Sequence, residues 1–315
     1  MAAIISRFAP APTGFLHLGH VVNAVYVWGV VRACGGRVLL RFEDHDRVRS
    51  RPEFEAAILD DLQWLGFASD EAPVRQSDRD DLYLHALEAL RQQGLVYACD
   101  CTRAQIAAAR PIPSDVIHAG SADELWYPGT CRTRGLPGHG AGVRIHLPPS
   151  TERFVDLRHG PLTQRPFEQC GDLLARDRDG NWTYQFAATV DDYVQNVTLV
   201  VRGDDLLAST GRQIQLARLL GRTDPPRFLH HPLVMKSQVH HFRDTASGVP
   251  ANPDPSQKVS KSDGDTGIRE LRARGWTPSR VVGYACALAG LIRDTRDVTA
   301  EEVSSMMGGF KEALS

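Results

Sequence analysis

The hydrophobic pattern near the N-terminus predicts a strand, a helix and a second strand. Apolar stretches at Ala3–Phe8 and Val38–Phe42 have the length of buried strands. Between them, Val21–Ala33 carries apolar residues at helical spacing, and Gly35 and Gly36 end that helix. A crossover helix between two strands predicts a parallel sheet, with the functional site at the carboxyl ends of the strands.

The rest of the pattern extends this α/β organisation. It predicts helices at Pro52–Leu65, Arg79–Gln93 and Arg212–Leu220, strands at Val143–Leu147 and Phe154–Leu157, and a renewed alternation at Gln185–Val190 and Val197–Val201. Asp177–Gly180 predicts a hairpin turn, and the residues from Gly267 onward predict helices. Stretches rich in Pro and Gly predict loops at 110–121 and 135–142 and a mobile segment at 240–257.

Length and composition indicate a cytoplasmic enzyme. The chain has 315 residues, enough for two or three structural units. Because it has no apolar run of 18 residues, no membrane span is expected. The start, MAAIISRF, lacks the pattern of a signal peptide. A net charge of −2 argues against a generally basic nucleic-acid coat but permits a local basic face.

Two motifs predict a nucleotide site. His17 and His20, with Gly19 between them, lie at the start of the first predicted helix, where N–H groups and a partial positive charge favour phosphate. Gly19 allows a flat base to approach the backbone. Lys258 and Lys261, in the sequence KVSKS, can neutralise charge on phosphates from a loop that closes after ATP enters. Either motif alone is a weak sign, but both in this order predict that the chain holds ATP while its α-phosphate is attacked.

Three of the six cysteines, Cys99, Cys101 and Cys131, suggest a metal site. Without an export signal, disulfides are not expected. Three thiolates leave one vacancy in a four-ligand zinc site. The candidates for that position on spacing are His118, His139 and Tyr127. Ordinary buried thiols are the alternative interpretation.

Five segments resemble the glutamyl branch of the class I aminoacyl-tRNA synthetases. They are RFAPAPTGFLHLGH from Arg7, LLRFEDHDRVRS from Leu39, WTYQFAATVDD from Trp182, VVRGDDLLASTGRQIQL from Val200, and KVSKS from Lys258. The resemblance implies a Rossmann-type parallel-sheet catalytic core at 1–95 and 183–240. It also implies an inserted, zinc-containing, acceptor-binding-like unit at 96–182, and the KVSKS loop with a helical, stem-contact-like domain at 241–315.

Charge and this resemblance together indicate glutamate as the amino acid. Its two carboxylates suit Arg7 and Arg202, its ammonium suits Glu43, and Tyr184 can hydrogen-bond and wall the pocket. The backbone expected to contribute is that of Phe8, Ala9, Pro10 and Ala11. Ala11 stands where the family usually has serine, which removes one side-chain hydrogen bond. For each charged residue taken alone, a surface salt bridge is the commoner explanation.

The chain ends at Ser315, whereas an ordinary glutamyl-tRNA synthetase continues into a large helical anticodon-binding region. The sequence therefore resembles the truncated paralogues, the glutamyl-queuosine tRNA(Asp) synthetases. Their Cys-x-Cys…Tyr-x3-Cys pattern implies four zinc ligands: Cys99, Cys101, Tyr127 and Cys131. His118 remains the rival of Tyr127. The sequence departs from the family pattern in the long Cys101–Tyr127 spacing, in the 240–257 segment, and at Val259.

The resemblance implies a reaction in two steps. The glutamate α-carboxylate attacks the α-phosphate of ATP with Mg²⁺ present, while His17, His20 and Lys261 stabilise the phosphates. A hydroxyl of the queuosine cyclopentenediol, in the anticodon of tRNA(Asp), then attacks the activated carbonyl. No protein nucleophile is needed.

The acceptor leaves alternatives open. Arg269, Arg272, Arg274 and Arg280 are candidates for contacts with tRNA phosphates, and a solvated helix face explains them equally well. The other functions to weigh are a shortened glutamyl-tRNA synthetase, a glutamate-activating enzyme with another acceptor, a nucleotidyltransferase, and a catalytically silent tRNA-binding paralogue.

Overall fold

The computed structural model describes residues 3–45, 47, 49–109, 125–138, 140–235 and 267–314. The strands are β1 (Ile5–Phe8), β2 (Arg37–Phe42), β3 (Val74–Arg75), β4 (Val96–Cys99), β5 (Gly142–Ile145), β6 (Glu152–Asp156), β7 (Gly160–Gln164), β8 (Leu173–Arg176), β9 (Leu199–Gly203) and β10 (Arg227–His231). The larger helices are α1 (Leu18–Ala33), α2 (Pro52–Leu65), α3 (Asp80–Gln92), α6 (Tyr184–Val194), α7 (Thr210–Leu219) and α10 (Pro278–Leu288). The shorter helices are α4 (Arg103–Ala108), α5 (Pro166–Cys170), α9 (Ile268–Ala273), α11 (Ala300–Val303) and α12 (Gly308–Leu314), with 3₁₀ turns η1 (Gln76–Asp78), η2 (Asp204–Ser209) and η3 (Ser304–Met307).

The predicted parallel sheet is confirmed. β1 pairs with β2 in parallel, with Ile5 opposite Arg37, and α1 is the crossover between them. β9 and β10 are also parallel, and β10 pairs with β6. The Thr198 N–H donates to the Ile5 carbonyl at 2.9 Å, which joins β9 to the free edge of β1. β1 therefore lies between β2 and β9, where the strand order changes direction, and such a point opens a crevice at the carboxyl ends of the strands.

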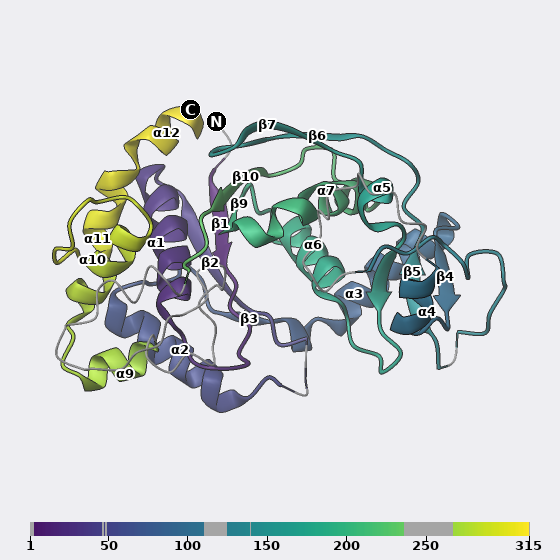
Figure 1. Cartoon of the computed structure of the whole chain (residues 1–315), viewed down its shortest axis with the longest axis horizontal. Helices are drawn as coiled ribbons and strands as arrows, with labels where there is room; N and C mark the ends of the chain where they lie inside the picture. Colours follow the sequence, from purple (N-terminus) through teal and green to yellow (C-terminus); the bar gives the residue numbers. More distant parts are fainter. Residues whose placement is uncertain are drawn as a thin grey trace.

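The C-terminal helices pack against α1 (Figure 1). Val25 of α1, Val281 of α10, and Val303 and Met307 of α11 and η3 all belong to one buried hydrophobic cluster. Gly29 of α1 permits the close approach, because a Cβ there would lie 2.8 Å from the Val303 Cγ1. The described residues after 267 are thus mainly helical, as predicted, and share a core with the first βαβ unit.

A separate antiparallel sheet, in the order β4-β5-β8, lies at the other end of the molecule in Figure 1. Cys99 is the last residue of β4, and Cys101 follows two residues later. The hairpin of β6 and β7 falls inside the range 96–182 expected for the inserted unit, yet it lies in the sheet of β9 and β10. That range of the chain therefore contributes to two sheets, because the parallel pairing of β6 with β10 returns it to the core before α6 begins.

Candidate active site

The two motif histidines lie at the start of α1 and fix each other. His17 caps the helix, and its Nδ1 accepts the Gly19 N–H at 3.1 Å. His20 Nδ1 accepts the His17 N–H at 3.1 Å, and the two ring centres are 3.9 Å apart. Because both Nδ1 atoms are acceptors, a neutral imidazole at either position carries its proton on Nε2.

This cap changes one detail of the predicted phosphate site. N–H groups at the helix start were expected to be available to phosphate, but the Gly19 N–H is already bonded to the His17 side chain. A Cβ on Gly19 would lie 2.9 Å from the His17 Cε1, so the imidazole accounts for the glycine. The helix therefore begins at Leu18, earlier than the predicted Val21. The approach of a flat base to Gly19 stays a prediction.

The chain returns to these histidines after the KVSKS sequence. Gly267, the first described residue beyond it, forms an antiparallel bridge with His17. The Ile268 N–H donates to the Leu16 carbonyl at 3.0 Å. Lys258 and Lys261, like the 240–257 segment, lie outside the described residues.

Arg7 and Glu43 lie near the carboxyl ends of β1 and β2 and are linked through Asp192 of α6 and Arg41. Arg7 Nε donates to Asp192 Oδ1 at 2.9 Å, and Arg7 Nη1 donates to the Val201 carbonyl at 3.3 Å. Arg41 donates to the same Asp192 Oδ1 at 2.7 Å and to Glu43 Oε1 at 3.2 Å. A buried network therefore sets the positions of both predicted glutamate-binding groups.

Burial and charge oppose each other in this network. Burial raises the pKa of Glu43, and Arg41 and Arg7 offset that rise only in part. Burial acts on Asp192 in the same sense, but Arg7 and Arg41 lower its pKa below the usual value. Burial lowers the pKa of Arg41, yet Asp192, Asp191 and Glu43 raise it overall, so its guanidinium stays charged.

Arg202 of β9 and Tyr184 of α6 complete the cluster. Arg202 Nη1 donates to Gln213 Oε1 at 2.6 Å, and Nη2 donates to Thr210 Oγ1 at 2.9 Å. Burial lowers the pKa of Arg202 and Arg7 lowers it further, while a hydrogen bond with Tyr184 raises it. Burial and the nearby Glu43 raise the pKa of Tyr184. The structure thus brings together the four side chains predicted around glutamate.

The backbone predicted to contribute is partly engaged within the protein. The Pro10 carbonyl accepts the Glu43 N–H at 3.1 Å, and the Ala11 carbonyl accepts the Thr13 N–H at 2.8 Å. Phe8 is buried, with its ring centre 5.2 Å from that of Trp28. These contacts hold the turn between β1 and α1 beside Glu43.

A cavity of about 440 Å³ extends from Tyr184 toward the cysteines. Its wall includes Leu206, Thr183 and Arg144, as well as Cys99 and Cys101. Tyr184, Cys99 and Cys101 therefore border one space, whereas Arg7, Glu43 and Arg202 are not among the residues that line it.

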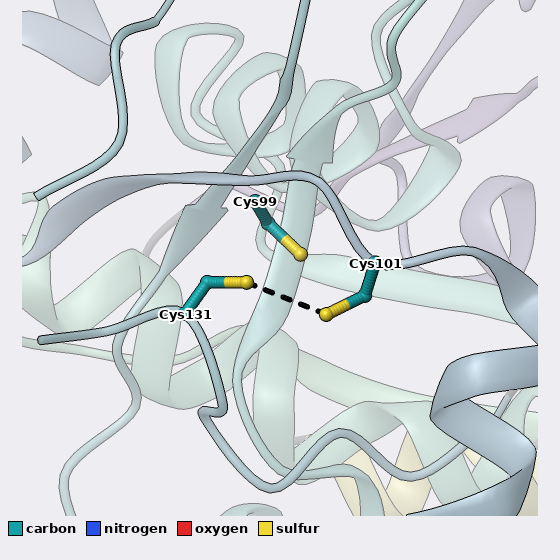
Figure 2. Close-up of side chains that lie close together, drawn as sticks. All are labelled: Cys99, Cys101 and Cys131. Atoms are coloured by element: carbon teal, nitrogen blue, oxygen red, sulfur yellow. Dashed lines mark hydrogen bonds between the residues drawn. The ribbon is translucent and has the colours of Figure 1, made fainter. Parts of the chain in front are cut away.

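Cys99, Cys101 and Cys131 point their sulfur atoms toward one another (Figure 2). These atoms all lie within 4.8 Å of each other. The Tyr127 hydroxyl lies 3.3 Å from the Cys99 Sγ and 3.7 Å from the Cys101 Sγ, and its side chain is fully buried. Three sulfurs and a phenol oxygen are a donor set that fits a zinc ion. His118 and His139 lie outside the described residues.

Two arginines donate to this sulfur cluster. Arg144 Nε lies 3.3 Å from the Cys99 Sγ, and its guanidinium carbon lies 3.7 Å from the centre of the Tyr127 ring. Arg134 Nη1 lies 3.3 Å from the Cys131 Sγ. Positive groups at these distances stabilise thiolate and phenolate, which are the metal-binding forms.

Residues 3–243 match the family model of the class I tRNA synthetases (E and Q), catalytic domain. The chain is 40% identical over 277 residues to a glutamyl-Q tRNA(Asp) synthetase from Pseudomonas fluorescens, covering 88% of this chain and 86% of that protein. It is 38% identical over 316 residues to a glutamyl-Q tRNA(Asp) synthetase from Symbiobacterium thermophilum, covering 95% and 91%. The chain belongs to the glutamyl-Q tRNA(Asp) synthetase family. Members of this family are ligases of the class I aminoacyl-tRNA synthetase type.

A solved structure agrees with this family assignment. The crystal structure of a glutamate tRNA ligase from Elizabethkingia meningosepticum, in complex with its amino acid, superposes with a TM-score of 0.73 at 26% identity. The match covers 98% of this chain and 65% of that chain. This glutamyl-Q tRNA(Asp) synthetase family member therefore spans slightly less than two thirds of the length of that ligase.

Sequence reasoning missed several residues that hold the cluster. Arg41, Asp192, Thr210 and Gln213 lie inside the segments that carry the family resemblance, but no role was assigned to them. A charged residue at Arg41, within an apolar strand pattern, is a sign of a buried ion pair. His230 lies outside all five segments and gave no signal.

The structure also bears on two general expectations. Among the helices in the described ranges, none has the length and apolar character needed to cross a membrane. Of the four arginines considered for tRNA phosphates, Arg272 is bonded to Asp60 at 2.7 Å, and Arg269 and Arg280 lie over the rings of Phe15 and Trp276.

Proposed function

We propose that this protein activates L-glutamate with ATP and transfers it to the cyclopentenediol of queuosine in the anticodon of tRNA(Asp). The observation that carries the proposal is the cluster of the buried Arg7, Glu43 and Arg202 with the half-buried Tyr184 at the carboxyl ends of the parallel strands. It occurs in a chain 40% identical to a glutamyl-Q tRNA(Asp) synthetase.

In this proposal the cluster binds glutamate through its charges. The two carboxylates pair with Arg7 and Arg202, and the ammonium pairs with Glu43. Asp192 and the Val201 carbonyl occupy Arg7 Nε and Nη1, so Nη2 can meet a carboxylate oxygen. Tyr184 walls the pocket through its hydrogen bond with Arg202. Phe8, Ala9, Pro10 and Ala11 provide the adjoining backbone.

The phosphates of ATP then lie at the start of α1. His17 and His20 present Nε2–H donors to phosphate oxygens, and their rings adjoin the turn that follows β1. Lys258 and Lys261 stabilise the phosphates as pyrophosphate leaves. The bridge between Gly267 and His17, six residues beyond Lys261, supports their participation. Mg²⁺, when bound with ATP, neutralises part of the phosphate charge.

The metal site is proposed as structural zinc held by Cys99, Cys101, Tyr127 and Cys131. The mutual proximity of the three sulfurs and the phenol oxygen supports this set. A bound zinc ion would cross-link the end of β4 to the loop that carries Tyr127 and Cys131. It takes no part in the reaction.

The domain division proposed is a catalytic core at 1–95 and 183–240, a metal-containing unit at 96–182, and the KVSKS loop with a helical domain at 241–315. The exception is the β6–β7 hairpin, whose strand pairing favours assigning it to the core. Arg272 and Arg274 stay candidate contacts for tRNA phosphates, and each already has an interaction within the protein, which for Arg272 is the ion pair with Asp60.

Glutamate-dependent exchange of pyrophosphate into ATP tests the activation step. We expect exchange without tRNA, and Arg202→Gln should raise the KM for glutamate while leaving the KM for ATP within about twofold. Glu71→Gln is the control, because Glu71 pairs with Arg37 on the surface. Equal exchange with glutamate, glutamine and aspartate would refute the pocket assignment.

Transfer of labelled glutamate tests the acceptor. tRNA(Asp) that carries queuosine should accept glutamate, and tRNA(Asp) with guanosine in its place should not, because it lacks the cyclopentenediol hydroxyl. Labelling should weaken with salt if tRNA phosphates are bound. Labelling of the 3′ end of tRNA(Glu), with none on queuosine-containing tRNA(Asp), would identify a shortened glutamyl-tRNA synthetase instead.

A further inference from the structure

A buried chain of three side chains crosses the core sheet and ends on Arg202. Asp156 ends β6, His230 lies in β10, and Arg202 lies in β9. These strands are neighbours in the sheet, and His230 and Arg202 are directly paired in the register of β10 and β9. All three side chains are almost completely buried, so water does not compete for their hydrogen bonds.

The hydrogen bonds along this chain have one consistent direction. Arg202 Nε lies 2.9 Å from His230 Nε2, and a guanidinium can only donate, so Nε2 is the acceptor. His230 therefore carries its proton on Nδ1, which lies 2.7 Å from Asp156 Oδ2. The backbone N–H of His230 donates to the same oxygen at 3.0 Å. Asp156 thus selects the histidine tautomer that Arg202 requires.

Asp156 is itself held as an acceptor. Its Oδ1 accepts the backbone N–H groups of Arg158 at 2.9 Å and His159 at 3.0 Å. The turn after β6 therefore fixes Oδ1, while Oδ2 faces His230. The carboxylate cannot rotate away from His230 without losing these bonds.

We propose that Asp156 and His230 are positioning residues, which fix the Arg202 guanidinium for the substrate carboxylate. Gln213 and Thr210 hold the two terminal nitrogens, and His230 holds Nε, so three directions define the guanidinium plane. A correctly oriented plane matters because bidentate pairing with a carboxylate requires coplanarity. The proposal rests on the assignment of Arg202 to glutamate binding.

Two substitutions of His230 distinguish a role in positioning Arg202 from a role in filling space. His230→Gln places an amide oxygen near the position of Nε2 and so can still accept from Arg202. His230→Asn keeps a donor near Nδ1 for Asp156 but offers nothing to Arg202. We expect His230→Asn to raise the KM for glutamate about tenfold or more in pyrophosphate exchange, with the KM for ATP within about twofold. His230→Gln should lie closer to the unaltered protein.

Asp156→Asn tests the tautomer. The amide oxygen of the new asparagine should stay bonded to the Arg158 and His159 N–H groups. Its NH₂ group then faces His230 Nδ1. The imidazole proton then moves to Nε2, where it opposes the Arg202 donor. We expect a KM for glutamate raised as in His230→Asn. His85→Asn is the matched control, because His85 is exposed on α3.

The outcomes separate the proposal from a purely structural role and from the proposed function. An unchanged KM for glutamate in His230→Asn refutes positioning. Equal losses of kcat in His230→Gln and His230→Asn, with lowered melting temperature and unchanged KM, also refute it, because they indicate packing alone. Absence of glutamate-dependent exchange in the unaltered protein contradicts the proposed function itself, before any variant is compared.

Discussion

His230 should make the stability of the protein fall as the medium becomes mildly acidic. Burial lowers the pKa of His230 from 6.5 to about 4, while its hydrogen bond to Asp156 opposes that change. The folded protein therefore holds this imidazole neutral at a pH where the unfolded chain protonates it. The loss of stability begins as the pH falls below about 6.5, and it is complete below about 4.

The magnitude follows from the two pKa values. At about pH 5, protonation of the unfolded chain favours unfolding by roughly a factor of 30, which corresponds to about 2 kcal/mol. At about pH 7 the same effect is a few tenths of a kcal/mol or less. His230→Gln removes the titrating group, so it should remove this part of the pH dependence.

Urea unfolding of the unaltered protein and His230→Gln, at about pH 7 and about pH 5, measures the difference. We expect the unaltered protein to lose about 2 kcal/mol more than the variant over this interval. Other groups, such as Glu43 and His231, are common to both proteins and cancel. Equal losses of unfolding free energy in the two proteins would show that His230 is protonated in the folded state at about pH 5. That result would contradict the neutral tautomer inferred from its hydrogen bonds.

Three more predictions concern the ion pairs and the cysteine cluster. Asp192→Asn leaves the buried Arg41 with one carboxylate fewer and should lower the free energy of unfolding by about 3–5 kcal/mol in urea, whereas Glu71→Gln should cost less than about 1 kcal/mol. Arg144→Gln should weaken zinc retention about 10–100-fold in chelator competition, because the Arg144 Nε that donates to the Cys99 Sγ is lost. Unchanged retention would show that Arg144 does not support zinc binding. Since burial raises the pKa of Glu43 above its ordinary value, Glu43 should lose its charge at a higher pH than an ordinary glutamate, and the KM for glutamate should rise as the pH falls; a KM that does not change with pH would contradict this prediction.

The sequence alone determined the local elements and the chemical character of the site. Apolar periodicity depends only on neighbouring residues, so the βαβ unit was predicted, and α2 was predicted with its observed ends, Pro52 and Leu65. The prediction of a turn at Asp177–Gly180 was also correct. Gly180 adopts a φ of 87°, which favours glycine and so leaves a local signal in the sequence. The motifs named Arg7, Glu43, Tyr184 and Arg202, but only as side chains suited to glutamate.

Only the tertiary structure decided how those side chains are held. Asp192 meets Arg7 and Arg41 across more than 150 positions of sequence, and Asp156 meets His230 across 74. The β6–β7 hairpin joined the core sheet through long-range pairing that no local pattern records. Strand pairing brings distant segments into register, and burial then makes each polar group depend on its partner. Such partners have no fixed spacing in the sequence, so periodicity and motifs cannot reveal them.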